Sequence, residues 1–154
     1  MTSLRARLQE LGHTLPTPAT SVGKYAGHKI TGNQLWCVQG PVDGEKLIYQ
    51  GRVGRDYDLK QAQACARFVM LNILAQLEVA TGGDMDRIVQ AVRLGGYICT
   101  TEDFSEHTLV MNAASDILHD TLGERGQHAR FVVGCTSLPF NLALEIEAVF
   151  EVER

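Results

Sequence analysis

"HARFVVGCTSLPFNLALEIEAVFEV", residues 128–152, contains two strand-like stretches on either side of a Leu138-Pro139 turn. Both stretches are rich in β-branched and aromatic residues, which favour strands. Proline lacks a backbone N–H and interrupts regular pairing. We therefore predict two strands, over residues 130–137 and 142–153, joined by a short turn.

The second stretch alternates between apolar and mostly acidic residues with a period of two. Successive side chains of a strand point to opposite faces, so this pattern predicts one core face and one polar face. The core face comprises Leu144, Ile146, Ala148, Phe150 and Val152, and the other face comprises Glu145, Glu147, Val149, Glu151 and Glu153. The same rule, applied to the first stretch, separates Phe131, Val133 and Cys135 from Arg130, Val132 and Gly134.

Two long helices are predicted upstream of this block. Asp58 followed by Gln61 has the spacing of a capping box and starts the first helix, which Gly82 and Gly83 end. Residues 105–123 form the second helix, whose apolar face comprises Val110, Ala113, Ala114, Ile117 and Thr121. The other predicted elements are a helix at residues 3–11, a hairpin at 28–40 with its turn at Gly32-Asn33, and strands at 47–53 and 87–100.

The predicted elements after the N-terminal helix follow the order strands, helix, strand, helix and two strands. The strand at 87–100 has apolar residues on both faces, so we expect it to be central and covered on both sides. Two long helices cover only one face of such a sheet. The second face is expected to carry Arg130, Glu145 and Glu147, and in an oligomer it could pack against a neighbouring copy.

Length and composition limit the class of protein. A chain of 154 residues suits a single domain, residues 1–154, with residues 1–15 as a helical extension. The net charge is −4 and no basic run is present, which argues against nucleic acid as the main partner. No signal-like segment and no membrane-spanning apolar stretch is seen, so the cytoplasm is the expected location and no membrane partner is expected.

Metal and cofactor chemistry has no sequence support. The four cysteines, Cys37, Cys65, Cys99 and Cys135, contain no C-x-x-C pair, so a zinc site is not expected. Phosphate-binding loops, nucleophile elbows and zinc-protease motifs are absent, and the five histidines are scattered. We predict neither a metal nor a cofactor.

Arg130 and Glu145 are the charged pair that stands out. One interpretation is an exposed cross-strand ion pair, which would contribute only tenths of a kcal/mol. The other is a small-molecule site, in which arginine holds a carboxylate through two parallel hydrogen bonds and glutamate orients or activates a water. Periodicity alone favours the first interpretation.

The C-terminal block resembles the YjgF/Rid family of reactive-intermediate (imine) deaminases, often described as "endoribonuclease L-PSP". Arg130, the Leu138-Pro139 turn and "EIEA" at residues 145–148 match the family's pattern in order and spacing. Similar segments upstream are "SVGKYAGHKITGNQLWCVQG" at 21–40, "DMDRIVQAVRLGGYICTTEDF" at 84–104 and "VMNAASDIL" at 110–118. The resemblance covers about residues 16–153 and indicates a longer-chain subgroup.

The resemblance implies an α+β, chorismate-mutase-like fold, in which a mixed sheet has two long helices packed on one face. It also implies a homotrimer with three clefts between subunits. It implies hydrolysis of 2-imino acids to 2-keto acids and ammonia. In that reaction Arg130 would hold the substrate carboxylate, and Glu145 would position water with help from the backbone carbonyl near Val132. Tyr25 would line the cleft and Asn112 would belong to its rim.

The hairpin departs from the family pattern at one place. Where the family commonly has Ser-Gly-Gln, this chain has Val38-Gln39-Gly40, so the serine hydroxyl is missing and glutamine is shifted by one position. A shift of one residue sends a strand side chain to the opposite face. This departure supports a second hypothesis, a non-catalytic trimer that binds small carboxylates. A third hypothesis, an endoribonuclease, is disfavoured by the acidic net charge.

Overall fold

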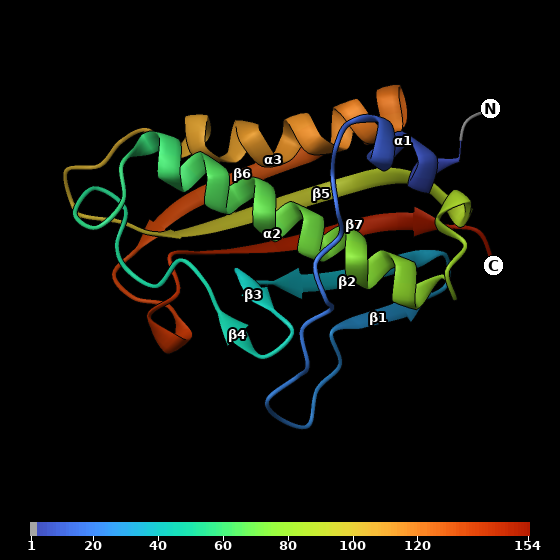
Figure 1. The fold of residues 1–154 in the computed structure, drawn as a ribbon, viewed down its shortest axis with the longest axis horizontal. Helices are drawn as coiled ribbons and strands as arrows, with labels where there is room; N and C mark the ends of the chain where they lie inside the picture. The colour runs from blue at the N-terminus through green and yellow to red at the C-terminus, as the bar shows by residue number, and fades with distance from the viewer. Residues whose placement is uncertain (1–2) are drawn as a thin grey trace.

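The structure is a computed structural model that describes residues 3–154. Helices and strands alternate along the chain much as the sequence predicts (Figure 1). In chain order they are α1 (Leu4–Glu10), β1 (His28–Thr31), β2 (Gln34–Gln39), β3 (Val42–Asp43), β4 (Lys46–Leu47), α2 (Leu59–Ala80), β5 (Ile88–Cys99), α3 (His107–Leu122), β6 (Ala129–Cys135) and β7 (Leu144–Val152). Short 3-10 turns lie at Met85–Arg87, Gly123–Gly126 and Pro139–Asn141.

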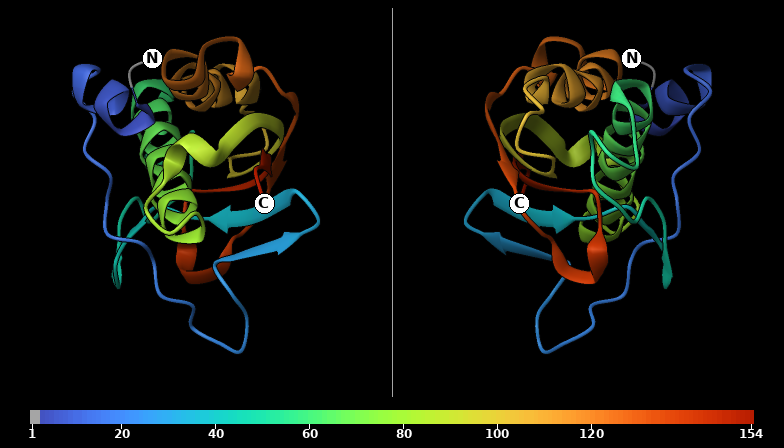
Figure 2. Two further views of the ribbon diagram at one scale, coloured as in Figure 1. Left: turned by 90° about the vertical axis from the view of Figure 1, so that its right-hand side faces the viewer. Right: turned by 90° about the vertical axis from the view of Figure 1, so that its left-hand side faces the viewer.

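Within residues 3–154, the main sheet has five strands in the order β1-β2-β7-β5-β6. The β5–β6 pair is parallel, whereas β7 is antiparallel to both of its neighbours. Helices α2 and α3 lie side by side on one face of this sheet (Figures 1 and 2). The predicted α+β fold, a mixed sheet with two long helices on one face, is confirmed.

The caps of the long helices follow the sequence prediction. The Asp58 side chain accepts a hydrogen bond from the Gln61 backbone at 2.8 Å, and the Gln61 side chain accepts one from the Asp58 backbone at 2.9 Å. These bonds satisfy backbone N–H groups that a helix start otherwise leaves unpaired. Gly123 ends α3 with a φ of 62°, a conformation that favours glycine.

The alternation in β7 is confirmed. Leu144, Ile146 and Ala148 are buried on the helix side, where they meet α2 and α3 in the hydrophobic core. The short helix α1 also joins this core, because Leu4 and Leu8 are both buried in it. Residues 1 and 2, part of the predicted extension, lie outside the described residues.

The prediction that Arg130 shares a face with Glu145 and Glu147 is wrong. Arg130 lies opposite Leu94, and Leu94 in turn lies opposite Ala148, a core residue. Paired residues of neighbouring strands point to the same face, so Arg130 points to the helix side. Glu145 lies opposite Tyr97, three residues further along β5, and points to the other side.

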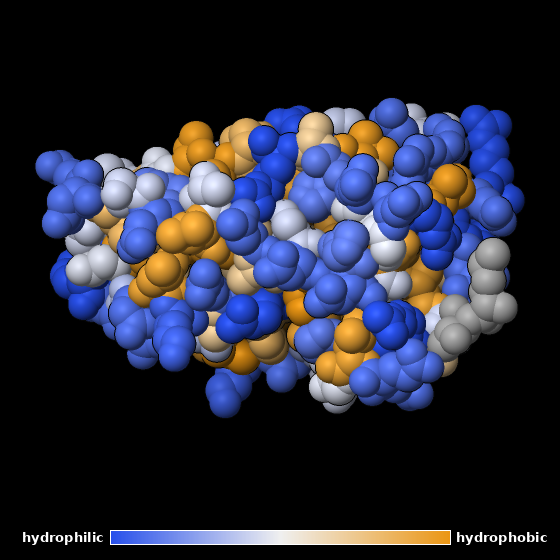
Figure 3. All heavy atoms as spheres, turned by 90° about the horizontal axis from the view of Figure 1, so that it is seen from above, coloured by the Kyte–Doolittle hydropathy of each residue, from blue (hydrophilic) through white to orange (hydrophobic). Residues whose placement is uncertain are grey.

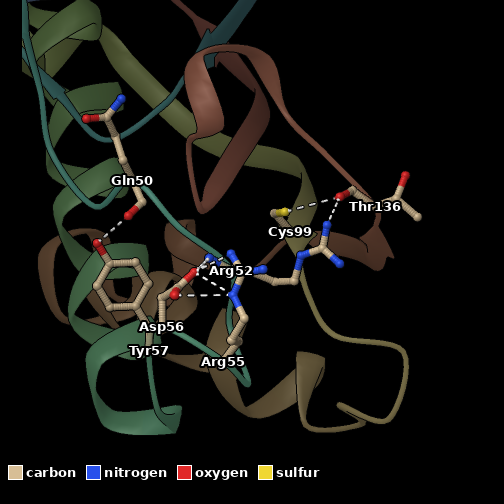
Figure 4. Close-up of polar contacts among 7 residues, drawn as sticks. All are labelled: Gln50, Arg52, Arg55, Asp56, Tyr57, Cys99 and Thr136. Carbon is tan, nitrogen blue, oxygen red and sulfur yellow. Dashed lines mark hydrogen bonds and ion pairs between the residues drawn. The ribbon is translucent and has the colours of Figure 1, made fainter.

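The predicted strand at residues 47–53 is also wrong. Only Lys46–Leu47 forms a strand, paired with Val42–Asp43, and the chain then turns because Tyr49 and Gly51 have positive φ. Side chains stabilise the loop that follows (Figure 4). Asp56 accepts a hydrogen bond from the backbone N–H of Arg52 at 2.7 Å and one from the Arg55 guanidinium at 2.9 Å.

Strand β5 has a neighbour on each side, but helices cover only one of its faces, which corrects the expectation of cover on both. Its pairing with β7 contains register shifts between Ile88 and Gln90 and between Ala91 and Arg93. Such bulges change which face a residue points to, so apolar residues at odd and even positions need not mark two buried faces. The outward face carries Arg93, Gly95 and Tyr97.

The two sides of the molecule differ in character. Seen from the helix side, the surface is mostly hydrophilic with scattered apolar patches (Figure 3). Within residues 3–154, no helix covers the opposite side of the sheet (Figure 2). Trp36, Val38 and Val133 lie on that uncovered face and are 39%, 54% and 45% exposed, respectively. The uncovered face therefore offers apolar surface to a partner.

Candidate functional site

A pocket of about 750 Å³ opens at the uncovered face of the sheet. The loop at 19–29, strand β2, the β3–β4 hairpin and the turn at 139–142 form its walls. Most of the large side chains in these walls are apolar: Val22, Tyr25, Trp36, Val38, Leu47 and Phe140. A concave, largely apolar site with a few polar groups is typical of small-molecule binding.

Two buried amides on α2 hold the walls of this pocket in place. Asn72 donates a hydrogen bond to the carbonyl of Gly40 at 3.1 Å and another to the carbonyl of Val42. Gln76 donates to the carbonyl of Ala19 at 3.3 Å. Since buried amides are costly without partners, these bonds tie the loops firmly to the helix.

Glu145 lines this pocket together with two other acidic residues, Glu45 and Glu147. It is half-buried on β7, and no hydrogen bond or ion pair to its carboxylate is present within residues 3–154. Burial raises the pKa of Glu145 above its ordinary value of 4.5. Tyr25 lines the same pocket from the loop before β1. A partly buried carboxyl group with a raised pKa in a pocket is a candidate for acid–base chemistry.

Arg130 lies in a second group of polar side chains, between β6 and α3. Its Nη1 donates to Ser115 Oγ at 2.9 Å, and its Nη2 donates to Asn112 Oδ1 at 2.9 Å and to the Thr108 carbonyl at 3.4 Å. His128 Nε2 lies 2.9 Å from the same Ser115 oxygen. We call Arg130, Asn112, Ser115 and His128 the Arg130 cluster.

The predicted site residues thus fall into two groups. Tyr25 and Glu145 share the pocket, whereas Arg130, Asn112 and Val132 gather at β6 and α3, on the other face of the sheet. This separation also rules out a cross-strand ion pair between Arg130 and Glu145 within one copy. The ion pair on the outward face is instead Arg93 with Glu147, at 3.5 Å.

Ser115 and His128 are the polar residues that sequence reasoning missed. His128 precedes Arg130 by two residues, which places both side chains on one face of the strand. Ser115 follows Asn112 by three residues, which places both on one face of the helix. These spacings are visible in the sequence, but only the β6–α3 packing shows that they meet.

The altered hairpin residues occupy opposite faces, as the sequence predicts. Val38 lies opposite Glu147 and points outward, whereas Gln39 lies opposite Ile146 and is buried on the helix side. There Gln39 is close to Cys37, whose thiol pKa burial raises to about 12. Gln39 thus borders the pocket, but its side chain is buried on the face of the sheet opposite to that of Glu145.

The cysteines are reduced in the structure, and Cys37, Cys65 and Cys99 are buried. Among residues 3–154, no three His, Cys, Asp or Glu side chains come together in a way that could hold a metal ion. Over the same residues, none of the helices combines the length and the apolar character that spanning a membrane requires.

The fold and pocket define an α+β protein of the chorismate-mutase-like type with a carboxylate in an apolar cleft. The family described as "YjgF/chorismate_mutase-like, putative endoribonuclease" matches residues 5–151. The chain belongs to this family.

Three relatives match over almost the whole chain. Protein TCP17 of Trypanosoma cruzi is 34% identical over 151 residues, 97% of this chain and 94% of TCP17. The crystal structure of Atu1372 from Agrobacterium tumefaciens, a protein of unknown function, is 41% identical with a TM-score of 0.89, covering 97% of this chain and 92% of that one. A "putative endoribonuclease" structure from Shewanella oneidensis MR-1 is 34% identical with a TM-score of 0.92, covering 97% and 99%.

Proposed function

We propose that this protein hydrolyses 2-imino acids to 2-keto acids and ammonia, in clefts between the copies of a homotrimer. Membership of the YjgF family supports the reaction class. The observation that carries the proposal is the half-buried Glu145, which has a raised pKa and faces an apolar pocket. A titratable side chain with a perturbed pKa in a pocket is a candidate functional residue.

The chemistry requires a base, an acid and an anchor. A water molecule attacks the carbon of the protonated imine while Glu145 accepts one proton from that water, and a neutral carbinolamine forms. Glu145 then gives this proton to the nitrogen and accepts the hydroxyl proton as the C–N bond breaks, so ammonia leaves and the ketone forms. An imine carbon is already electrophilic, so positioning supplies much of the rate and no step needs a metal or cofactor.

The carboxylate anchor is Arg130 of a neighbouring copy. Within one copy Arg130 and Glu145 lie on opposite faces of the sheet. Strand β6 is an edge strand, so Arg130 lies at the border of the molecule, where a second copy can approach. The exposed apolar side chains of the uncovered face support such packing. Asn112 and Val132 would reach the cleft from the same copy as Arg130.

The pocket indicates which imino acids fit. Val38 and Trp36 present apolar surface in the pocket that Glu145 also lines, and no serine hydroxyl faces the ligand at this part of the hairpin. We expect imino acids with branched or aromatic side chains to be better substrates than small polar ones. Burial of each additional CH₂ group is worth about 0.8 kcal/mol.

An amino-acid oxidase supplies the substrate for the test. L-Leucine is oxidised by L-amino-acid oxidase with catalase present, and semicarbazide traps the remaining imine. The protein is expected to lower the yield of semicarbazone and to speed the release of 4-methyl-2-oxopentanoate. Unchanged trapping with imines from leucine, phenylalanine and alanine would refute the proposal.

The trimer has its own measurement. Light scattering coupled to size exclusion is expected to give three times the chain mass of 16.9 kDa. A monomer at micromolar concentration would remove the second copy that the Arg130 anchor requires.

The valine at position 38 keeps the binding hypothesis open as a second candidate, because the pocket face lacks the usual hydroxyl. A non-catalytic carboxylate-binding trimer would be stabilised against heat by 2-keto acids without any turnover of imines. The family description also includes endoribonuclease. RNA cleavage that persists through purification and is lost in Glu145→Gln would favour that activity instead.

A further inference from the structure

A chain of hydrogen bonds runs from the turn before β6 to the guanidinium of Arg130. His128 Nδ1 lies 2.6 Å from the carbonyl oxygen of Gly126. His128 Nε2 lies 2.9 Å from Ser115 Oγ, and that oxygen lies 2.9 Å from Arg130 Nη1. All three side chains are partly buried between β6 and α3, so these contacts are shielded from competing water.

The partners determine the direction of each hydrogen bond. A carbonyl oxygen only accepts, so Nδ1 of His128 carries a proton and donates it to Gly126. Nε2 of the neutral ring is then an acceptor, and the Ser115 hydroxyl donates to it. The lone pairs of Ser115 Oγ are left facing Nη1 of Arg130, which donates. Burial and the charge of Arg130 lower the pKa of His128, which favours this neutral form.

The guanidinium has two edges on which a carboxylate can accept two parallel hydrogen bonds, and both edges include Nη2. One Nη2 hydrogen bond goes to Asn112 Oδ1 at 2.9 Å, and the other, to the Thr108 carbonyl, is long at 3.4 Å. Nε has no acceptor within residues 3–154. A carboxylate can therefore bind Nε and compete at Nη2, where the Thr108 bond is the longer of the two bonds present, while Ser115 retains its bond to Nη1.

We propose that Ser115 and His128 are positioning residues that fix the plane of Arg130, so that its Nε/Nη2 edge is presented to the carboxylate of a 2-imino or 2-keto acid. This inference rests on the proposed function, because it assumes that Arg130 binds substrate. An arginine that is already oriented loses less side-chain entropy on binding, which lowers the ligand concentration needed for half-saturation.

The test separates orientation of Arg130 from a purely structural role. Ser115→Ala removes the oxygen between His128 and Arg130, Ser115→Thr keeps a hydroxyl, and Ser105→Ala is a matched control in the exposed loop before α3. For the leucine-derived imine, Ser115→Ala is expected to raise KM by about tenfold with kcat within twofold of wild type. The Kd of 4-methyl-2-oxopentanoate should rise in parallel, and Ser115→Thr should restore both values.

His128 gives an independent variant. His128→Gln retains an acceptor for the Ser115 hydroxyl and is expected to keep a near-normal KM, whereas His128→Leu should behave like Ser115→Ala. Unchanged KM and Kd in Ser115→Ala and His128→Leu would overturn the inference, as would a fall in kcat and melting temperature without a change in KM.

The variant Arg130→Gln distinguishes a failure of the positioning role of Ser115 and His128 from a failure of the proposed function. If Arg130→Gln raises KM and Ser115→Ala does not, only the positioning role is wrong. If Arg130→Gln has no effect, or wild type neither turns over the imine nor binds the keto acid, the proposed role of Arg130 is wrong and the positioning role is wrong with it.

Discussion

The charged groups of the Glu145 pocket and of the Arg130 cluster have opposite surroundings. The Glu145 carboxylate lines a largely apolar pocket and has no hydrogen-bond or ion-pair partner among residues 3–154, and burial raises its pKa. The Arg130 guanidinium instead has hydrogen-bond acceptors on both Nη atoms. A partly buried carboxyl group such as that of Glu145 is suited to proton exchange. A guanidinium fixed by hydrogen bonds, such as that of Arg130, is suited to binding an anion without reorientation. The proposed function thus assigns acid–base chemistry and carboxylate binding to side chains on two faces of one sheet.

The largest effect is expected at Glu145. Glu145→Gln keeps the shape of the side chain but cannot accept a proton, so imine hydrolysis should fall about 100- to 10,000-fold. The rate of keto-acid release in the oxidase-coupled assay measures this loss. Glu153→Gln removes the same charge from an exposed position near the end of the chain and should leave the rate unchanged. Equal rates in wild type and Glu145→Gln would show that the pocket is not the reaction site.

A smaller effect is expected at Arg130. Loss of a bidentate, charge-assisted hydrogen bond costs about 1.5–3 kcal/mol, so Arg130→Gln should raise KM roughly 10- to 100-fold. Steady-state kinetics with several concentrations of leucine-derived imine gives this value. Arg93→Gln is the control, since Arg93 is an arginine of the outward face that pairs with Glu147. A larger rise in KM for Arg93→Gln than for Arg130→Gln would identify Arg93 as the carboxylate anchor instead.

Val38 provides a test of the pocket walls. Val38→Ser replaces apolar surface beside Glu145 with a hydroxyl, so kcat/KM for the leucine-derived imine should fall about fivefold. The kcat/KM for the serine-derived imine should rise relative to that for the leucine-derived imine, so the ratio of the two kcat/KM values should change. A ratio that stays the same would mean that the substrate side chain does not contact the hairpin.

The smallest effect concerns stability and follows from the raised pKa of Glu145. The folded protein binds this proton more tightly than the unfolded chain, so the stabilisation is complete below the unfolded pKa of 4.5 and is lost as pH rises through the folded pKa. At pH 7.5 the buried charge is therefore destabilising, and Glu145→Gln should melt at a higher temperature than wild type.

The pH dependence of this difference is the decisive measurement. The gap in melting temperature between Glu145→Gln and wild type should shrink steadily as pH falls from 7.5 toward 4, because the wild-type carboxyl becomes neutral. A gap that is constant over this range would contradict the raised pKa.

Much of the fold follows from local patterns in the chain. The capping box at Asp58 and Gln61, the stop at Gly123 and the alternation from Leu144 to Val152 each depend on neighbouring residues only, and each is present in the structure. The loop at 48–57 was not predicted, because the apolar residues at its start are typical of a strand. The positive φ values at Tyr49 and Gly51 turn the backbone and prevent a strand from forming there.

The sequence by itself determined which residues of each strand share a face, because side chains alternate with a period of two wherever a strand lies. Only the tertiary structure decided which face of β6 meets the helices, because that depends on the pairing of Leu94 with both Arg130 and Ala148. One long-range register thus placed Arg130 beside Ser115 and His128, and away from Glu145 of its own copy.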